Sequence, residues 1–556
     1  MATHEVFNQA APLVDVNLFA TDRALADALT REGAGAAAPA LQALGAELGS
    51  SAMQEQGRLA NAYPPIFRPF DRAGRRIDEV EFHPAWHALM ARLIGEGVHA
   101  DPWVQPGPGA QVARAAKYFL FSQVENGTQC PTTMTYAVVP VMQKFAAAVP
   151  AVAQDWLPKI LSRAYDPASA PVAAKRGVLL GMGMTEKQGG SDVRSNTTRA
   201  ELAGRSRYGD EYRLTGHKWF FSAPQCDAHL VLAQTDPGSP AGITCFLVPR
   251  WLPDGSRNAI RVQRLKDKVG NKSNASSEVE FEGATGWPVG EVGRGIPTIL
   301  EMGTLTRLDC AIGSAGQIRF VVAMALHHAA QRSAFGRKLV EQPLMRNVLA
   351  DLALESEAAT ALVLRLARAY DGRAAGDPLA DGLCRVLTPA AKYWICKRGP
   401  TVGAEAMEVL GGNGYVEDAP MGRFFRELPL NSIWEGSGNV MGLDVLRALG
   451  RTPACREALE AEFAAARGGD ARLDAHAERL RAELRRPEVD EFSARRLTES
   501  IALGVQASLL VRHAPAAVAD AFCASRLGEA AGWGRAFGTL PAGIAPSPLI
   551  ERAMPA

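Results

Sequence analysis

This 556-residue sequence lacks the signals of a secreted, membrane-spanning or metal-binding protein. Its cysteines are scattered, with no CxxC pair and none of the spacing of zinc sites or disulfide frameworks, so we expect buried reduced thiols and no metal site. The N-terminal segment has no basic start followed by an apolar run, so we expect no secretion signal. No stretch approaches the ~18–20 uninterrupted apolar residues of a membrane-spanning helix. We therefore expect a cytoplasmic protein without membrane contact.

The charge balance excludes a general attraction to nucleic acid, membranes or acidic ligands, because the formal net charge is only +1. Any such partner must be recognised by a local patch. Hydrophobic residues make up 47% and charged residues 21%, which is ordinary for a globular protein. A chain of this length exceeds the ~250–300 residues of a single core, so it should divide into several domains.

The periodicity of apolar residues changes along the chain. Up to about residue 180, segments such as AWHALMARLIGEGVHA have helical spacing, and short alternating segments such as EYRLTGHKWFFSA and GITCFLVPR follow. Long helical patterns return near Gly295, and after Leu446 lysine disappears while Arg and Ala dominate. We predict a mainly α fold with a central antiparallel β-barrel and an extra C-terminal helical domain. The predicted domains are N-terminal helical (1–180), β-barrel (181–290), helical bundle (291–445) and appended helical (446–556).

This order of elements is not that of a doubly wound nucleotide-binding fold, in which strands and helices alternate. The stretch that begins at Gly181 also lacks the third glycine of GxGxxG, because Glu186 stands there. A Rossmann-type cofactor site is therefore not expected.

The most specific segment is GMGMTEKQGGSDVRSNTTRA, residues 181–200. Thr185, Ser191 and the amides around Gly189 and Gly190 offer a polar, close-approach surface for a ring system with donors and acceptors, although such clusters are usually plain turns. The segment resembles the T-E-x-x-x-G-S-D signature of the acyl-CoA dehydrogenases. Three further segments resemble that family in the same order: GHKWFFS (216–222), QRSAFG (331–336) and AMEVLGGNGY (406–415).

This resemblance implies an acyl-CoA dehydrogenase fold and FAD as cofactor. In the family, the three later segments place an aromatic and a hydroxyl residue against the flavin, reach the FAD of a neighbouring subunit, and pass the FAD diphosphate. Taken singly, Phe220 could be barrel core, Arg332 a solvated charge and Gly411–Gly414 a helix end. The cofactor-binding residues implied by the resemblance are Met182, Met184, Thr185, Gly190, Ser191, Phe220, Phe221, Ser222, Arg332, Phe335, Gly411, Gly412, Ile433, Trp434, Gly436, Ser437, Asn439 and Leu443.

A fifth segment, NSIWEGSGNVMGLDVLR (431–447), resembles the Y-E-G-T-like stretch that carries the family's catalytic base. Glu435 occupies that position, which implies that it removes the α-proton of an acyl thioester while a hydride passes to the flavin. Flavin and Trp434 would raise its pKa by desolvation. The alternative is that Glu435 caps a helix or pairs with Arg447.

Some relatives carry the base just before an arginine on the preceding long helix, but here Thr306 precedes Arg307. The same stretch often binds CoA through an acid–arginine pair, whereas this chain adds Asp309 close by. A carboxylate that faces phosphates would repel them. We therefore expect turnover of CoA thioesters, if present, to be slow or incidental.

The matching segments, together with VFNQ and TREGAG near the start, most closely resemble the AidB-like proteins of the response to DNA alkylation. This implies a homotetramer that binds double-stranded DNA through an added C-terminal domain and has at most weak acyl-CoA dehydrogenase activity. Residues 446–556 contain 15 Arg, no Lys and 14 Asp plus Glu, so composition alone does not indicate DNA binding. Acidic residues among the arginines favour a salt-bridged surface helix instead. The implied DNA-contacting residues are Arg447, Arg479, Arg481, Arg485 and Arg486.

Two other functions stay open at this stage. One is a metabolic acyl-CoA dehydrogenase that acts on a short or branched acyl-CoA. The other is a scaffold in which FAD only stabilises the fold.

Overall fold

The protein is described here by a computed structural model, which covers residues 3–236, 239, 242–485, 490–528 and 536–555. Contacts between residues group the chain into two compact units. Unit 1 comprises residues 1–54, 107–124 and 307–556, and unit 2 comprises residues 55–106 and 125–306. The four domain ranges expected from the sequence follow the linear order of the chain, whereas each unit is assembled from separate segments.

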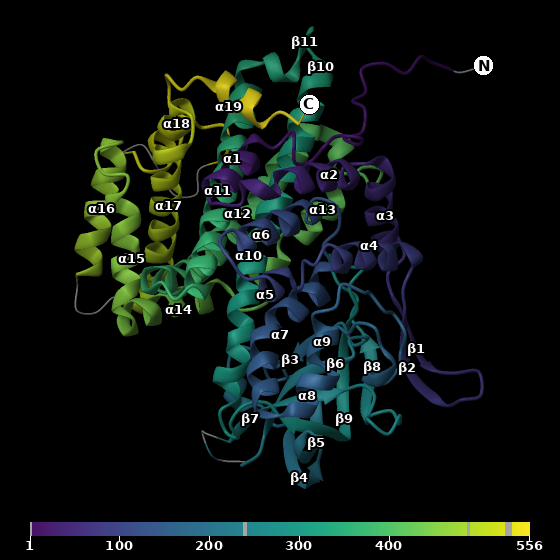
Figure 1. Ribbon diagram of the computed structural model, residues 1–556. Helices are drawn as coiled ribbons and strands as arrows, with labels where there is room; N and C mark the ends of the chain where they lie inside the picture. The colour runs from purple at the N-terminus through teal and green to yellow at the C-terminus, as the bar shows by residue number, and fades with distance from the viewer. Residues whose placement is uncertain (1–2, 237–238, 240–241, 486–489, 529–535, 556) are drawn as a thin grey trace. The chain divides into compact units, whose positions relative to one another are not determined.

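Among the residues that the structure describes, unit 1 is helical apart from one short hairpin (Figure 1). Two helices, α3 (Ser51–Ala62) and α10 (Gly295–Gln331), cross the boundary between the units. The elements of unit 1 are α1 (Arg23–Arg31), η1 (Gly35–Ala37), α2 (Ala38–Leu48), α6 (Ala110–Phe121), β10 (Ser333–Ala334), β11 (Arg337–Lys338), η4 (Leu339–Glu341), α11 (Pro343–Ala374), α12 (Pro378–Leu410), η5 (Gly411–Gly414), α13 (Met421–Glu427), η6 (Leu430–Ser432), α14 (Gly438–Arg451), α15 (Pro453–Ala464), α16 (Ala471–Leu484), η7 (Glu491–Ser493), α17 (Ala494–His513), α18 (Ala516–Arg526) and α19 (Pro546–Ala553).

The central helix of unit 1 is α12, which packs against α11, α14, α15 and α17 (Figure 1). Its start is fixed by Asp377, whose carboxylate accepts hydrogen bonds from the amides of Leu379 and Ala380, with Pro378 in the first turn. Its end is fixed by Gly411 at φ 62° and ψ −143°, a conformation that side chains disfavour. The sequence therefore sets where the helix stops and the η5 turn begins.

Helix α10 is the one described helix long and apolar enough to cross a membrane. However, 94% of its most apolar window is buried inside the protein. Burial of this degree is the pattern of a core helix surrounded by protein.

Unit 2 combines short helices with most of the strands. Its elements are β1 (Ile66–Phe70), β2 (Arg76–Glu81), α4 (Pro84–Gly95), α5 (Asp101–Val104), α7 (Gln129–Ala148), α8 (Pro150–Asp155), α9 (Leu157–Ile160), η2 (Val172–Ala174), β3 (Leu180–Gly183), η3 (Val193–Ser195), β4 (Arg199–Ser206), β5 (Gly209–Ser222), β6 (Ala228–Gln234), β7 (Ile243–Pro249), β8 (Ile260–Leu265) and β9 (Ser276–Pro288). The hairpin β1–β2 lies within the range predicted to be helical. Its strands alternate over only five and six residues, too few to stand out against the helical patterns around them.

The main sheet of unit 2 is mixed, with the order β3-β6-β4-β5-β9-β7 and β8 on β9. The prediction of a purely antiparallel sheet is therefore wrong in part, because β6 pairs in parallel with both β3 and β4. A parallel pair joins strands that are distant in sequence, and alternation within each strand does not reveal its partner. Strand β6 also pairs with β7, so the pairings from β6 through β4, β5, β9 and β7 return to β6.

The core of this sheet is formed by the residues that point inward, which are alternate residues along each strand. The buried cluster consists of Ala200, Leu214, Phe221, Val231, Ala233, Phe246, Val248, Val262, Val279, Phe281 and Ala284. All lie on β4 to β9, as the period of two along a strand requires.

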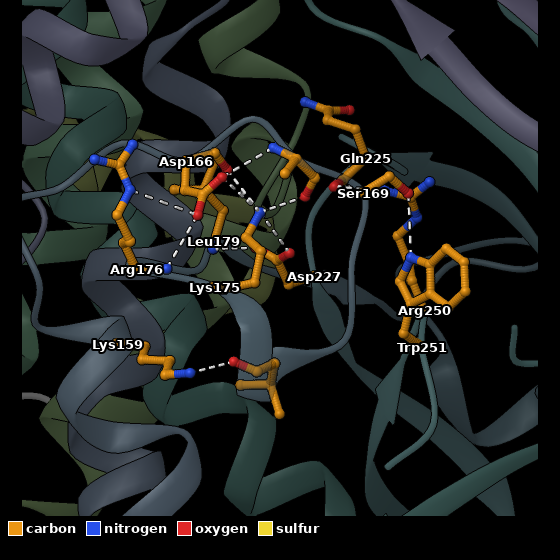
Figure 2. A network of polar contacts seen from close by, with 12 residues as sticks. Lys159, Asp166, Ser169, Lys175, Arg176, Leu179, Gln225, Asp227, Arg250 and Trp251 are labelled. Atoms are coloured by element: carbon orange, nitrogen blue, oxygen red, sulfur yellow. Dashed lines mark hydrogen bonds and ion pairs between the residues drawn. The ribbon is translucent and has the colours of Figure 1, made fainter. Parts of the chain in front are cut away.

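A buried polar network ties the segment before β3 to the start of β6 (Figure 2). Lys175 Nζ lies 3.1 Å from the Asp227 carboxylate and donates to the carbonyl oxygens of Asp166 and Ala168, both at 2.6 Å. Asp227 in turn accepts a hydrogen bond of 2.9 Å from the amide of Leu179. The network fixes the point at which β3 enters the sheet beside β6, and β3 leads directly into the 181–200 segment.

Candidate functional site

In unit 2, the 184–198 loop is organised around one buried carboxylate, Glu186. Its Oε1 accepts from Lys218 Nζ at 2.7 Å and from Thr198 Oγ1 at 2.6 Å. Its Oε2 accepts from the Thr197 amide at 2.7 Å and from Gln188 Nε2 at 2.8 Å. The side chains of Glu186 and Lys218 are both 0% exposed. The carboxylate therefore holds both ends of the loop that carries Thr185, Gly190 and Ser191.

The pKa shifts follow from this pairing. Burial alone would raise the pKa of Glu186, but the charge of Lys218 and the surrounding hydrogen bonds lower it to about 2. Burial lowers the pKa of Lys218 to about 8, although Glu186 opposes the shift. The pair is thus ionised at neutral pH and acts as a structural anchor.

A bulge in β5 separates the two neighbouring phenylalanines of the GHKWFFS segment. The register of β5 against β9 shifts between Lys218 and Phe221. Phe220 is 51% exposed, whereas Phe221 is 1% exposed and stacks on His229 at 3.9 Å between ring centroids. Because bulges re-aim side chains, this irregularity turns one ring outward. Phe220 fits the predicted stacking role, while Phe221 can offer a ligand only its backbone.

The outward face also carries cations that sequence reasoning missed. Lys266 Nζ lies 3.6 Å from the ring centroid of Trp219 and 4.4 Å from that of Phe220. Its partner across the pair of strands is Glu278 at 2.7 Å. Among the other predicted residues of this unit, Met182 is buried in β3, Met184, Thr185 and Ser222 are half-buried, and Gly190 and Ser191 are exposed.

In unit 1, the loop that carries Glu435 is held by two cations through its main chain. Lys392, 1% exposed on α12, donates from Nζ to the carbonyl oxygens of Trp434, at 2.7 Å, and Gly436. Arg307 Nε donates to the carbonyl oxygen of Glu435 itself at 2.9 Å. Three consecutive carbonyl groups thus accept hydrogen bonds from two positive side chains. Nothing in the sequence indicates this role for either cation, and the resemblance relates Arg307 only to a CoA-binding pair.

This arrangement supports an unusual backbone at Glu435, whose φ is 58°. A non-glycine residue in the left-handed region costs free energy and persists where surrounding contacts determine it. Gly436 follows at φ 107°, which only glycine adopts readily. The conformation of the loop therefore requires the glycine of the Glu-Gly pair, whereas the glutamate adopts its conformation at a cost.

A chain of hydrogen bonds continues behind the same loop. Trp434 Nε1 donates to Asn431 Oδ1 at 2.8 Å, and Asn431 Nδ2 donates to Ser314 Oγ at 3.0 Å. Ser314 Oγ lies 3.3 Å from Cys396 Sγ. The chain links η6 to α10 and α12, so the half-buried Trp434 ring has a fixed position next to Glu435. Burial raises the pKa of the Cys310 thiol well above its usual value. The charge of Lys392 opposes this shift, and Cys396 and Glu435 add to it.

The expectation that Asp309 repels CoA phosphates is wrong. Asp309 is 1% exposed and forms a bidentate ion pair with Arg114 of α6, which is itself 2% exposed. A carboxylate neutralised inside the helical core does not present its charge to a ligand. Arg307 contacts Asp444 of α14 at 2.9 Å as well as the Glu435 loop. Thr306 donates to the Gly303 carbonyl at 3.0 Å.

The QRSAFG segment forms the β10–β11 hairpin and binds the N-terminal segment of the same unit. Asn8 accepts from the Ser333 amide at 2.7 Å and donates to its carbonyl at 2.8 Å, and Arg332 donates to the Asn8 carbonyl. Phe335, at the tip of the hairpin, is 98% exposed with φ 52°. The VFNQ stretch therefore fixes the position of Arg332 through Asn8.

The remaining predicted residues of unit 1 line surfaces open to solvent. Gly411, Gly412, Ser437 and Asn439 are exposed, Leu443 is half-buried and Ile433 is 64% exposed. Ile433 and Phe335 are exposed apolar side chains of this unit at positions that the resemblance assigns to FAD binding, and a bound aromatic cofactor would cover such side chains. The residues present are therefore compatible with FAD.

The predicted DNA-contacting arginines divide into two groups. Arg481 is paired with Glu460 at 2.7 Å and Glu478 at 2.5 Å, as expected for a salt-bridged surface helix. Arg447, Arg479 and Arg485 are exposed, and no ion pair joins them to another described residue. Arg486 lies outside the described residues.

Comparison with known proteins agrees with this architecture. The adaptive response protein AidB N-terminal domain matches residues 8–167, the acyl-CoA dehydrogenase middle domain matches residues 181–284, and the acyl-CoA dehydrogenase C-terminal domain matches residues 293–450. The chain is 51% identical to the AidB protein of Escherichia coli (strain K12) over 94% of each sequence. The chain belongs to the AidB branch of the acyl-CoA dehydrogenase family.

Solved structures place this acyl-CoA dehydrogenase family member in the same fold group. The Bd2924 apo-form has a TM-score of 0.84 at 30% identity over 92% of this chain and all of that one. The Caenorhabditis elegans protein ACDH-11, solved in complex with C11-CoA, has a TM-score of 0.85 at 26% identity over 95% of this chain and 94% of that one. The prediction of an acyl-CoA dehydrogenase-type oxidoreductase is confirmed.

Proposed function

We propose that this protein is an FAD flavoprotein of the alkylation-damage response that binds double-stranded DNA and has at most weak acyl-CoA dehydrogenase activity. The observation that carries the proposal is the 51% identity to an AidB protein along 94% of the chain. Its cofactor is FAD, as in the family to which it belongs. Each unit carries one set of the residues that the resemblance assigns to that cofactor.

Glu435 is the residue we assign to proton abstraction. The hydrogen bonds from Lys392 and Arg307 hold the main chain on both sides of it, so its carboxylate leaves the loop in a defined direction. A positioned carboxylate contributes about 10²–10⁴-fold to a proton transfer. When bound, FAD accepts the hydride that leaves the acyl chain.

Exposed arginines support the DNA-binding part of the proposal. Arg447 and Arg485 have no ion-pair partner among the described residues and are free to contact phosphates. The expected behaviour is binding to duplex DNA that weakens with salt, with the slope of log K against log salt reduced by about 0.9 for each phosphate contact removed. Arg447→Gln and Arg485→Gln should each reduce the slope, whereas Arg481→Gln, which removes an internally paired arginine, should not.

Self-association is the next part of the proposal. Phe335, Leu344 and Tyr415 are 98%, 85% and 84% exposed in unit 1. Apolar side chains at this exposure are typical of surfaces covered by another subunit. We propose a homotetramer in which Arg332 and Phe335 reach the FAD of a neighbouring subunit. We also propose that the protein is cytoplasmic and that it has the four domain ranges given above. We also interpret the closed circuit of strand pairings in unit 2 as a barrel.

The alternative is a metabolic acyl-CoA dehydrogenase that acts on a short or branched acyl-CoA. One observation favours it: Asp309 is neutralised by Arg114, so the expected repulsion of CoA phosphates disappears. The experiment that separates the two functions is anaerobic flavin bleaching by a panel of acyl-CoAs, combined with salt-titrated duplex binding. Slow bleaching with salt-sensitive DNA binding supports the proposed function. Rapid bleaching without DNA binding supports the metabolic enzyme.

A further inference from the structure

Unit 1 contains a cavity of 280 Å³ whose described lining includes no residue of the 431–443 segment. It is bordered by α11, α12, α16 and α17 and by residues at and beyond the end of α18. Its volume is close to the lower limit of the ~300–1,000 Å³ typical of ligand pockets. The side chains of Trp394, Leu503 and Phe537 give it apolar walls, and several charged residues also line it.

Most of the lining charges are already matched. Arg398 contacts Glu355 at 3.0 Å, and Arg526 contacts Glu355 at 2.8 Å and Asp351 at 2.5 Å. Two guanidinium groups thus neutralise two buried carboxylates. The positive charges also lower the pKa of Glu355 to about 2, although burial alone would raise it.

The cavity-lining groups on α16 and on the first turn of α17 add little unmatched charge. Arg495 of the same turn does not line the cavity and lies over the ring of Tyr393. Arg496 is paired with Glu483 at 2.6 Å. His476 is bound to the Ser500 carbonyl at 2.9 Å, and burial lowers its pKa, so it is neutral at pH 7. Arg479 is exposed to solvent, which screens its charge.

Glu499 of α17 is the exception. It is 8% exposed and lines the cavity, yet it has no hydrogen bond or ion pair with any residue that the structure describes. Burial raises the pKa of Glu499 to about 8. The charge of Arg398 opposes this shift, and the charge of Glu355 adds to it. An isolated carboxyl in such surroundings is costly unless a positively charged donor meets it.

We propose that this cavity binds a small organic cation with N–H donors, such as an alkylguanidinium or alkylammonium group, with the Glu499 carboxylate as its counter-ion. The aromatic faces of Trp394 and Phe537 suit the same ligand, because they attract cations as well as apolar groups. Arg398 already lies over both rings, 5.6 Å from the centroid of Trp394 and 4.8 Å from that of Phe537, which shows that the walls accommodate a guanidinium. The ligand would extend this arrangement towards Glu499.

Binding of such a cation is coupled to the loss of a proton from Glu499. The ionised fraction of a carboxyl with a pKa of about 8 rises from about a tenth at pH 7 to about nine tenths at pH 9. The affinity for the cation should therefore increase about tenfold over this range. A guanidinium probe stays fully protonated throughout, so the change belongs to the protein.

The test is calorimetric titration of the full-length, FAD-loaded protein with methylguanidinium at pH 7 and pH 9. We expect saturable binding that is about tenfold tighter at pH 9. Because Glu499 is mostly protonated at pH 7 and mostly ionised at pH 9, binding should release about one proton at pH 7 and only about a tenth of a proton at pH 9. Repeating the titration in buffers of different ionisation enthalpy detects the release. N-methylurea, a neutral probe of similar shape, and tetramethylammonium, which lacks N–H donors, should bind at least tenfold more weakly. Glu499→Gln should weaken methylguanidinium at least tenfold, whereas Glu491→Gln, an exposed control near the start of α17, should leave it unchanged.

Three results would overturn the proposal. Equal affinity of wild type and Glu499→Gln would show that the carboxyl is not the receptor. Binding of acetate in place of methylguanidinium, abolished by Arg479→Gln, would make the cavity an anion site. Absence of methylguanidinium binding at pH 9 would show that no such cation site exists. If Glu499→Gln fails to fold, proton release by the wild type on binding at pH 7 decides the question, because binding at pH 7 without release contradicts the proposal.

Discussion

Two glutamates of the family motifs are anchored in opposite ways. In unit 2, Glu186 is bound through its carboxylate oxygens, by Lys218 and by side-chain and backbone donors of the 197–198 pair. In unit 1, the cations Lys392 and Arg307 bind the main-chain carbonyl groups around Glu435. A carboxylate whose own oxygens are saturated can only stabilise a loop. The clamp on the main chain of Glu435 instead fixes the backbone from which its side chain extends, which suits the role in proton abstraction that we propose for it.

Loss of the Glu186 carboxylate should have the largest effect of the changes predicted for the two loops. Replacing Glu186 with Gln leaves the buried Lys218 without its counter-ion, so we expect the free energy of unfolding to fall by about 3–5 kcal/mol. Urea denaturation of the FAD-loaded protein measures the loss. The control is Glu280→Gln, an exposed glutamate of β9, which should change stability by about 0.5 kcal/mol or less.

The double variant Glu186→Gln/Lys218→Met tests whether the loss of stability comes from the unpaired Lys218 ammonium. Removing both charges together should restore part of the lost stability, because the uncompensated buried ammonium is gone. A double variant less stable than Glu186→Gln alone would contradict the assignment of the pair as a mutual anchor.

The same pair predicts a pH dependence. The folded-state pKa of Glu186, about 2, lies below its usual value of 4.5. Its contribution to stability is therefore complete above about pH 4.5 and is lost as the pH falls from there towards 2. The difference in unfolding free energy between wild type and Glu186→Gln should shrink over this window in urea titrations. A difference that is constant down to about pH 3 would be inconsistent with a depressed pKa.

The clamp on the Glu435 loop is tested by two arginines that share one partner. Arg307 and Arg385 both contact Asp444, at 2.9 and 2.8 Å, but only Arg307 also donates to the Glu435 carbonyl. Arg307→Gln should slow anaerobic flavin bleaching by acyl-CoA about tenfold or more, since a hydrogen bond from a charged donor contributes about 1.5–3 kcal/mol.

Arg385→Gln is the matched control and should change the rate by no more than about threefold. A similar loss in both variants would show that the ion pair with Asp444, and not the hydrogen bond to the loop, governs the rate.

The smallest expected effect concerns Phe220. Phe220→Leu keeps an apolar side chain at the bulge but removes the ring, so FAD affinity should fall by about 0.5–1.5 kcal/mol, or about two- to tenfold. Fluorimetric titration of deflavinated protein measures it. Phe70→Leu, an equally exposed phenylalanine on β1, should leave the affinity unchanged, and equal losses would remove Phe220 from the site.

Candidate site residues could be named from the sequence because motif residues keep fixed positions along the chain. Thr185, Phe220 and Glu435 could be named from short segments of sequence. Their partners were not predictable in this way. Lys392 lies 43 positions from Glu435, and nothing in AAKYWICKRG distinguishes it from a solvated helix charge until the fold brings α12 against the loop.

The errors have the same origin. Asp309 was interpreted from its neighbours in sequence, but its charge is set by Arg114, almost 200 residues earlier on α6. Strand alternation predicted the sheet of unit 2 but not the parallel pairing of β6 with β3 and β4, because a strand carries no local record of its partner's direction. The bulge that separates Phe220 from Phe221 likewise appears only when β5 is paired with β9.

The account depends most directly on Glu435 as the residue that removes the substrate proton. The decisive measurement is the single-turnover rate of anaerobic flavin bleaching in Glu435→Gln, with FAD content read from the visible spectrum of the same sample. We predict full FAD occupancy and a rate reduced by about 10²–10⁴-fold. A variant that retains FAD and bleaches at the wild-type rate would contradict the assignment.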